Sequence, residues 1–212
     1  AETRNSTAVA LADMDGDGLL DAVFANDGER NEVCYGIGGG ALQCYDTSAA
    51  VRSSTGVAVG HVNADGRMDA VFSNSGQASQ LCLGDGTTLF GCTDLPAGTR
   101  DTRGVAVGDV NGDGRLDAVF ANDGAANRVC LGDNAGGFAC SDVGFLSDRS
   151  QAVALGDLDG DGHLDAMFAN GGSANWVCLG NGAGAFQCSD VDQPGHFDRA
   201  VAIGQLDPNG RA

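Results

Sequence analysis

Lysine is absent from this sequence of 212 residues, and 29 acidic residues stand against only 11 arginines, so the formal net charge is −18. A surface this acidic repels phosphate backbones, which excludes nucleic acid as an expected partner. The sequence also lacks any apolar run of roughly 18 residues, so no membrane span is predicted. There are only 3 prolines and 6% aromatic residues but 35 glycines. This composition favours tight turns between short strands, and therefore an all-β fold.

The acidic residues gather in short Asp/Gly/Asn stretches between apolar runs, and one such stretch recurs. DMDGDGLLDAVFANDG at 13–28 matches DVNGDGRLDAVFANDG at 109–124 in 13 of 16 positions, at an offset of 96, which is twice 48. Further copies begin at His61 and Asp157, and a partial copy begins at Gln205. We therefore interpret 1–212 as one region of repeats, at approximately 5–52, 53–100, 101–148 and 149–196, with a partial fifth at 197–212.

Within one repeat the apolar residues alternate with a period of two, which is typical of strands. In the third copy the pattern predicts strands at 104–110, 116–122, 128–132 and 138–140, separated by Gly- and Asx-rich turns. Four short antiparallel strands in a unit of 40 to 50 residues fit one blade of a β-propeller.

The repeats resemble FG-GAP/VCBS repeats, the blades of integrin-α-type propellers. The resemblance rests on a strand ending in VAVGD, a loop of the form D-x-[DN]-x-D-G-x-x-D, a strand such as LDAVF and a later strand such as RVCLG. It implies a propeller, usually of seven blades, with calcium in the loop between strands one and two of each blade. It does not imply one particular activity.

The two ends of the chain bear on the number of blades. Residues 5–20 and 197–212 occupy the same phase of the repeat, so a closed ring of four units would contain strand one twice. We therefore expect four repeats and a partial fifth to form part of a larger, seven-bladed propeller, or a repeat assembly in which a neighbouring copy completes the last blade.

The loop chemistry can be argued from the residues alone. Ca²⁺ takes six to eight oxygen ligands, and side chains at positions 1, 3 and 5 of a tight turn converge on one point, while position 9 closes the shell. Glycine at position 6 permits the sharp reversal, and the backbone carbonyl at position 7 is a further expected ligand. The predicted ligands of the three complete loops are Asp13, Asp15, Asp17 and Asp21; Asp109, Asn111, Asp113 and Asp117; and Asp157, Asp159, Asp161 and Asp165.

Two loops depart from this pattern. In the second, His61 replaces the first aspartate, which leaves Asn63, Asp65 and Asp69, and imidazole is a poor ligand for a hard cation, so a weaker site is predicted. The fifth offers only Asp207 and Asn209. The loops are not EF-hands, which have 12 residues, end in Glu and lie between helices. The alternative is an Asx-rich turn without metal, since Asp and Asn favour turns.

Each repeat carries two cysteines ten positions apart, one on strand three and one on strand four. Residues placed in this way face each other across an antiparallel hairpin, which suits a disulfide. The predicted pairs are Cys34 with Cys44, Cys82 with Cys92, Cys130 with Cys140 and Cys178 with Cys188. A zinc site is the competing interpretation, but the spacing lacks a C-x2-C knuckle. Disulfides indicate an extracellular, secreted or cell-surface location, where the sequon at Asn5 could carry a glycan.

No nucleophile with a base, and no carboxylate pair outside the loops, breaks the repeat, so we do not expect an enzyme. Trp176 occupies a strand-three position that is polar in the other copies, and it could contact a ligand or pack partly buried. Two functions remain. The first is a calcium-binding, non-catalytic adhesion module for protein or carbohydrate. The second is a structural subunit of an extracellular fibre or surface assembly, whose partners are further copies of itself.

Overall fold

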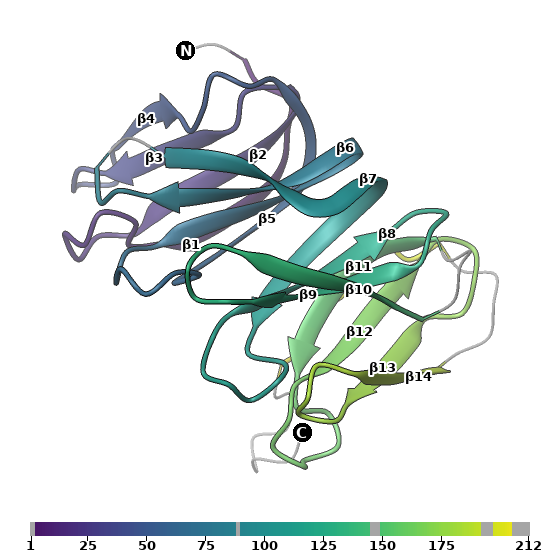
Figure 1. The fold of residues 1–212 in the computed structure, drawn as a ribbon. Coiled ribbons are helices and arrows are strands. Elements are labelled where there is room, and N and C mark those ends of the chain that lie inside the picture. The colour runs from purple at the N-terminus through teal and green to yellow at the C-terminus, as the bar shows by residue number, and fades with distance from the viewer. Residues whose placement is uncertain (1–2, 88–89, 145–148, 192–196, 205–212) are drawn as a thin grey trace.

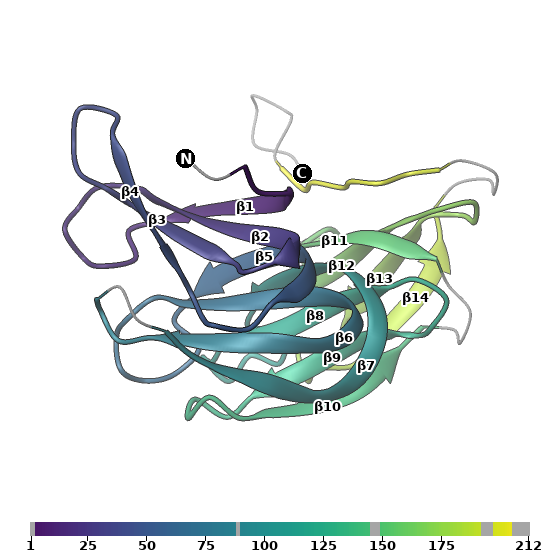
Figure 2. The ribbon, with the colours of Figure 1, turned by 90° about the horizontal axis from the view of Figure 1, so that it is seen from above.

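The computed structural model describes residues 3–87, 90–144, 149–191 and 197–204, and these form β-strands and turns with no helix. The predicted ligands Asp207 and Asn209 lie outside the described residues. The strands divide into four units at the 48-residue step of the sequence. Figures 1 and 2 show the units following one another in chain order, so that units adjacent in sequence lie side by side.

Units 1 and 4 each consist of four antiparallel strands in sequence order. The strands of unit 1 are β1 (Ser6–Ala12), β2 (Asp21–Glu29), β3 (Glu32–Gly36) and β4 (Leu42–Asp46). Those of unit 4 are β11 (Ser150–Gly156), β12 (Asp165–Asn170), β13 (Trp176–Gly180) and β14 (Phe186–Asp190).

Units 2 and 3 share a long strand. Unit 2 contains β5 (Arg52–Gly60), β6 (Asp69–Gly84) and the first half of β7 (Phe90–Gly108), and unit 3 contains the second half of β7 with β8 (Asp117–Asn122), β9 (Asn127–Gly132) and β10 (Phe138–Val143). The sequence predicts separate strands here. They merge because the residues that link strands two and three in unit 2 pair with β7, through Gln77 opposite Arg100 and Ala78 opposite Thr99.

The apolar core lies between the units. One cluster joins units 1 and 2 through Val23, Val33 and Phe72, with Val57 and Val59 of β5 packed against it. Two further clusters repeat the arrangement between units 2 and 3 and between units 3 and 4. In each interface, strand one of the later unit packs on the sheet of the earlier one, which is why the apolar alternation of strand one recurs in every copy.

The first strand of every unit begins with a β-bulge, between Ser6 and Ala8 in β1 and at the equivalent positions of β5, β7 and β11. A bulge leaves one residue out of the ladder and redirects its side chain. The described sheets are antiparallel and do not close into a ring.

Candidate metal centres

The first Asp loop connects β1 to β2 and is organised around the carboxylate of Asp13. Its Oδ1 accepts hydrogen bonds from the amides of Gly16 at 2.8 Å and Asp17 at 3.1 Å, and its Oδ2 accepts one from Gly18 at 2.9 Å. Gly16 and Gly18 both have positive φ, at 81° and 87°, which L side chains adopt with strain. The glycines therefore let the loop wrap around its first aspartate.

The third and fourth loops repeat this geometry. Asp109 accepts from the amides of Gly112 and Gly114, each at 2.8 Å. Asp157 accepts from Gly160 at 2.7 Å and from Gly162 at 3.0 Å. The aspartate at position 1 therefore holds the same turn in loops one, three and four.

Two loops bring three carboxylates close enough to share one ion. Asp13, Asp15 and Asp17 each offer an oxygen within 4.8 Å of the others, and so do Asp157, Asp159 and Asp165. Two oxygens that each lie about 2.4 Å from one Ca²⁺ are at most about 4.8 Å apart, so both groups fit this ion. In the third loop the amide of Asn111 stands at position 3, and its Oδ1 accepts a hydrogen bond from the Asp113 amide at 3.0 Å.

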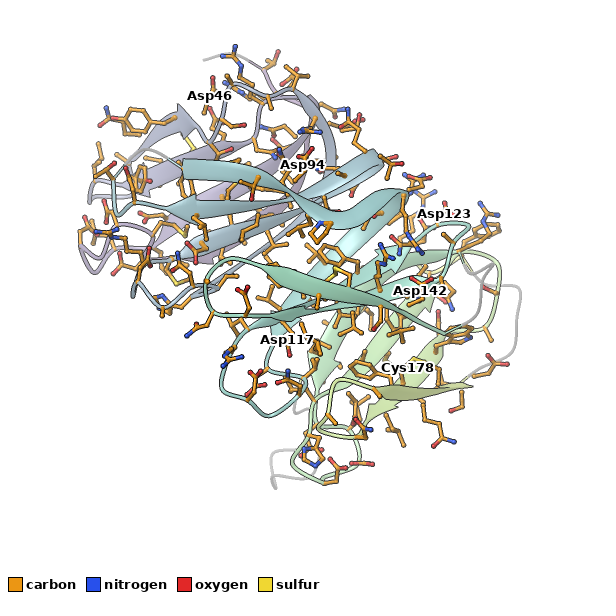
Figure 3. The ribbon with its side chains drawn as sticks, in the orientation of Figure 1. Asp46, Asp94, Asp117, Asp123, Asp142 and Cys178 are labelled. Carbon is orange, nitrogen blue, oxygen red and sulfur yellow. A yellow bond between two sulfur atoms is a disulfide. The ribbon has the colours of Figure 1, made fainter. Side chains whose placement is uncertain are left out.

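Position 9 has a structural role that sequence reasoning missed. Asp117, labelled in Figure 3, is fully buried, and its carboxylate accepts the amide hydrogens of Val110 and Gly132, both at 2.9 Å. It therefore ties the start of the loop to the end of strand three. Asp21, Asp69 and Asp165 make the equivalent pair of hydrogen bonds in the other units. The sequence does contain one sign of this structural role, because the aspartate directly precedes the apolar strand.

Burial and mutual repulsion affect these carboxylates. Burial raises the pKa of Asp69 and Asp117 above the ordinary value, and hydrogen bonds from backbone amides oppose the shift. Burial also raises the pKa of Asp15, with further contributions from the charges of Asp17, Asp21 and Asp13. A bound cation would relieve this repulsion.

The second loop is built differently. Its first residue, His61, donates from Nδ1 to the carbonyl oxygen of Arg67 at 2.8 Å. That carbonyl is the position-7 group expected to ligate calcium. The guanidinium of Arg67 also lies 3.9 Å from Asp65. The imidazole of His61 therefore takes the place of the first carboxylate of the other loops, whereas an arginine at position 7 is shared with the third loop, in which Arg115 lies 3.5 Å from Asp113.

The structure contains four disulfides, and they are the pairs that the ten-residue spacing predicts: Cys34–Cys44, Cys82–Cys92, Cys130–Cys140 and Cys178–Cys188. Each links directly opposed residues of strands three and four, as for Cys178 in Figure 3. Glu32 lies beside Cys34 and Cys44, but their sulfurs are joined to each other and are not available as thiolate ligands.

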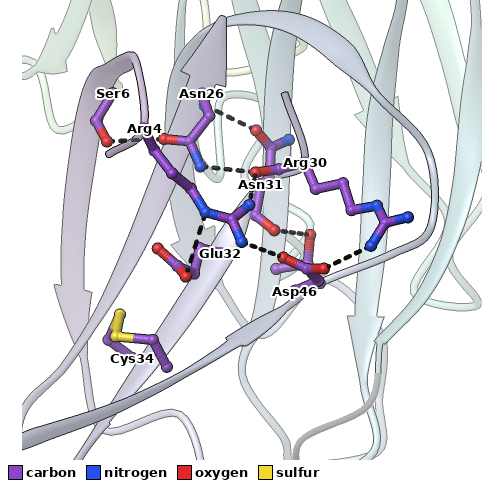
Figure 4. Close-up of polar contacts among 10 residues, drawn as sticks. Arg4, Ser6, Asn26, Arg30, Asn31, Glu32, Cys34 and Asp46 are labelled. Atoms are coloured by element: carbon purple, nitrogen blue, oxygen red, sulfur yellow. Dashed lines mark hydrogen bonds and ion pairs between the residues drawn. A yellow bond between two sulfur atoms is a disulfide. The ribbon is translucent and has the colours of Figure 1, made fainter. Parts of the chain in front are cut away.

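A buried asparagine at the end of strand two, whose role the sequence did not reveal, makes the same hydrogen bonds in every unit, and a second asparagine extends the network in units 1, 3 and 4. In unit 1, Asn26 accepts from Ser6 Oγ at 2.7 Å and donates to the carbonyl of Arg30 at 2.7 Å (Figure 4). Asn31 accepts from the Asn26 amide and donates to Ser54 Oγ of the next unit, both at 2.9 Å. The network therefore connects neighbouring units as well as strands within one unit.

An arginine closes the outer strand of each of the first three units. Arg4 lies 2.8 Å from Asp46 at the end of β4, and Arg30 reaches the same carboxylate at 2.9 Å (Figure 4). Arg52 with Asp94 and Arg100 with Asp142 form the equivalent pairs. Hydrogen bonds from Arg30 and Arg4 hold the pKa of Asp46 below its ordinary value.

Two further residues singled out by sequence have clear positions. Trp176 is 5% exposed and belongs to the cluster between units 3 and 4, so it packs in the core. Asn5 is exposed, and its backbone carbonyl accepts a hydrogen bond from the Asp27 amide.

These features define a class: an all-β repeat protein in which every unit combines an aspartate-rich turn, a buried position-9 aspartate and a disulfide-bonded hairpin. A family model described as FG-GAP-like repeat matches residues 61–120 and 109–168. The chain belongs to the FG-GAP-like repeat family.

The fold is similar to two solved structures. One is BBS1N, crystallised in complex with ARL6DN and soaked with lead, with a TM-score of 0.60 and 12% identity over 91% of this chain. The other is the V. cholerae biofilm matrix protein Bap1, with a TM-score of 0.55 and 17% identity over 87% of this chain. The chain spans 60% and 30% of those two chains. No curated protein matches it.

The disulfides and the family fit an extracellular protein. Among the described residues, no helix has the length and apolar character needed to cross a membrane.

Proposed function

We propose that this chain is a calcium-stabilised extracellular repeat module with a non-catalytic role in binding or adhesion. The observation that carries the proposal is the recurrence of carboxylate groups within 4.8 Å of one another in loops one and four, on turns of one design. The third loop shares the turn and offers Asp109, Asn111 and Asp113. A fold of this kind in a biofilm matrix protein is consistent with an extracellular setting.

Calcium would be held by positions 1, 3 and 5, with position 9 contributing where its oxygens are accessible. Its charge would offset the repulsion between aspartates and link the two strands that flank each loop. Each strong site would then add to stability, since an ion that binds only the folded chain shifts the equilibrium toward it.

Calorimetric titration with Ca²⁺ tests the metal sites directly. We expect three sites of similar affinity, in loops one, three and four, and weaker binding in the second loop. Replacing Asp13 and Asp17 together by Asn should remove one site and leave two. Asp190→Asn is the matched control, because Asp190 is exposed and lies outside the loops. No heat of binding, or an equal loss in the control, would sink the proposal.

We also propose that the four units are blades of a propeller. In support, each unit has four strands, and each interface repeats the packing of the one before it. One glycine of strand one meets the next unit at the same place each time, since a Cβ at Gly60 would contact Val107, one at Gly108 would contact Leu155, and one at Gly156 would contact Ile203. The segment at 197–204 thus packs on unit 4 as strand one of a further unit.

The second candidate function, a subunit of an extracellular fibre, is favoured by one observation. Val9, Leu11 and Leu20 of unit 1 are 54%, 61% and 65% exposed, whereas the equivalent residues of later units pack against the unit before them. Sedimentation velocity distinguishes the two candidates. A fibre subunit should self-associate as concentration rises, and Leu11→Glu should abolish the association. A single species at every concentration would leave only the binding module.

A further inference from the structure

A cavity of about 230 Å³ lies among units 3 and 4 and the segment at 197–204, and three arginines line it. Its walls include Arg103, Asp123, Arg149, Gln151, Phe197 and Arg199. These residues lie at the start of strand one and just after the end of strand two. The Asp loops lie at the other end of the same strands, roughly 20 Å away for a strand of seven residues.

The residues that line the cavity are those in which the repeat changes. The bulged position of strand one is Thr7 and Thr55 in units 1 and 2, and each threonine donates to a carbonyl of the next unit, at 2.8 and 2.7 Å. The same position is Arg103, Gln151 and Arg199 in the later copies. Two residues earlier, Asn5 and Ser53 give way to Asp101, Arg149 and Phe197. These substitutions are not needed for the fold, because units 1 and 2 form without them.

The cavity has more hydrogen-bond donors than acceptors. Asp123 accepts from Arg149 Nε at 3.3 Å, and Arg103 is held by Asp101 at 2.7 Å with Asp123 at 3.6 Å, so both of these arginines are oriented by carboxylates. This leaves the terminal nitrogens of Arg149 without a partner among the described residues, and Arg199 makes no described hydrogen bond or ion pair. A guanidinium presents five N–H donors in a planar fork that matches a carboxylate. In a chain of net charge −18, two neighbouring arginines with free donors, Arg149 and Arg199, indicate an anionic ligand.

Two other features of the cavity limit the kinds of anionic ligand that would fit it. Asp198 uses one carboxylate oxygen for Asn175, at 2.8 Å, so its second oxygen can accept from a hydroxyl group. The side-chain oxygen of Gln151 can do the same, since the side-chain nitrogen donates to the Arg149 carbonyl at 3.1 Å. Phe197 is 70% exposed and is held in place by its bridge to Gly171. An exposed aromatic ring beside hydroxyl acceptors suits a ligand with an apolar ring face and several hydroxyls.

We propose that this cavity binds the carboxylate-bearing sugar ring of an acidic glycan, of the uronic acid type. Arg149 and Arg199 hold the carboxylate, Asp198 and Gln151 accept from hydroxyls, and Phe197 packs on the ring. The assignment rests on the binding role proposed above, and it is separable from calcium because the cavity and the Asp loops lie at opposite ends of the strands.

The test is an NMR titration of the whole ¹⁵N-labelled chain with D-glucuronate. D-glucose, which lacks the carboxylate, is the neutral control ligand. Glucuronate should shift the amide signals of residues 149–151 and 197–199, and glucose should not. Arg149→Ala and Arg199→Ala should each weaken binding about tenfold or more, as expected for a charged hydrogen bond. Arg30→Ala is the control, because the Arg30 side chain is also exposed, at 49% against 57% for Arg149, but lies in unit 1.

Absence of shifts with glucuronate at tens of millimolar, equal shifts with glucose, or unchanged binding in both arginine variants would overturn the site. A short polyaspartate peptide that binds more tightly than glucuronate through the same arginines would overturn the sugar assignment. Repeating the titration after EDTA treatment separates the two proposals. Glucuronate binding that persists without calcium supports this cavity whatever the calorimetric result for the loops, and binding lost with calcium while the spectrum stays folded contradicts it.

Discussion

Buried polar side chains hold each unit together at the scale of single residues. The asparagine at the end of strand two is at most 1% exposed in every unit, and its side-chain amide joins strands two and three to strand one. These residues are Asn26, Asn74, Asn122 and Asn170. A buried amide is stable only when its hydrogen bonds are made, so each of these positions tolerates little change. The tetrapeptides that contain them, VFAN, VFSN and MFAN, look like ordinary ends of strands, which is why sequence reasoning assigned them no role.

Asn122 offers a direct measurement of this network. Asn122→Ala removes the acceptor of Thr102 Oγ and the donor to the Ala126 carbonyl, which are 2.8 and 2.7 Å away. We expect the free energy of unfolding to fall by about 2–3 kcal/mol, because buried groups lose their partners. Denaturant unfolding measures this loss. The exposed Ser141→Ala should change stability by less than about 0.5 kcal/mol, and an equal effect of both variants would contradict the role of the network.

The ion pairs of Asp46 should make the free energy of unfolding depend on pH. Arg30 and Arg4 lower its pKa in the folded chain below the ordinary 3.8, so the folded state binds this proton less readily than the unfolded state. Its contribution is present above the unfolded pKa and is lost as pH falls through the folded pKa. Asp46→Asn should therefore be less stable than the native chain at pH 7, and the difference should shrink as pH falls below about 4. A difference that stays constant would show that the ion pairs do not couple to stability.

Close backbone contacts explain much of the sequence regularity at the scale of the elements. The last residue of strand three is glycine in every unit, because a Cβ there would approach the carbonyl oxygen of loop position 8. The approach is 2.7 Å for Gly36, 2.3 Å for Gly84 and Gly132, and 2.2 Å for Gly180. The amide of the same glycine donates to the buried position-9 aspartate, so loop and strand are held at this point.

Gly132→Ala should therefore destabilise the chain by roughly 2 kcal/mol or more, because the backbone of the loop has to move. Gly91→Ala is the control within a strand, since a Cβ at Gly91 meets nothing within 4 Å. The midpoint of denaturant unfolding measures both variants. Similar midpoints for the two variants would show that the close approach at Gly132 is not a constraint.

The sequence predicted elements well where one repeat contains all the information. The four strands per unit, the disulfide-bonded hairpins and the position of the Asp loops all follow from periodicity and spacing within 48 residues. It failed where a contact joins segments that are distant from each other within one repeat. The merging of strands in β6 and β7 depends on Gln77 and Ala78 pairing with Arg100 and Thr99, and nothing local to either segment predicts it.

The candidate site was also only partly predictable. Positions 1, 3 and 5 follow from their alternation in the loop, and the carboxylate group at Asp13 has that form, whereas the group at Asp157 combines positions 1 and 3 with position 9. Position 9 as a ligand that closes the shell stays a prediction. Its oxygens also accept hydrogen bonds from backbone amides, a role that requires knowledge of where strand three ends. The cavity at Arg149 and Arg199 brings together residues 50 positions apart, which no local motif marks.

At the scale of the whole molecule, four similar units stack through three similar apolar interfaces, and each interface lies close to an Asp loop on either side. Stability in such an array depends on every unit and on every interface. The charge is uneven, since the loops concentrate carboxylates that repel one another. Calcium is therefore the central claim, because it would convert the repulsion among the loop carboxylates into a repeated link between strands one and two.

Thermal unfolding with and without calcium, under conditions that keep the disulfides oxidised, tests this claim most directly. A site occupied at a hundred times its dissociation constant adds about 2.7 kcal/mol, which corresponds to roughly 5–10 °C in Tm for a chain of this size. We predict that calcium raises Tm by at least that amount over EDTA, and that replacing Asp13 and Asp17 by Asn reduces the rise. The same Tm in calcium and in EDTA would contradict the account.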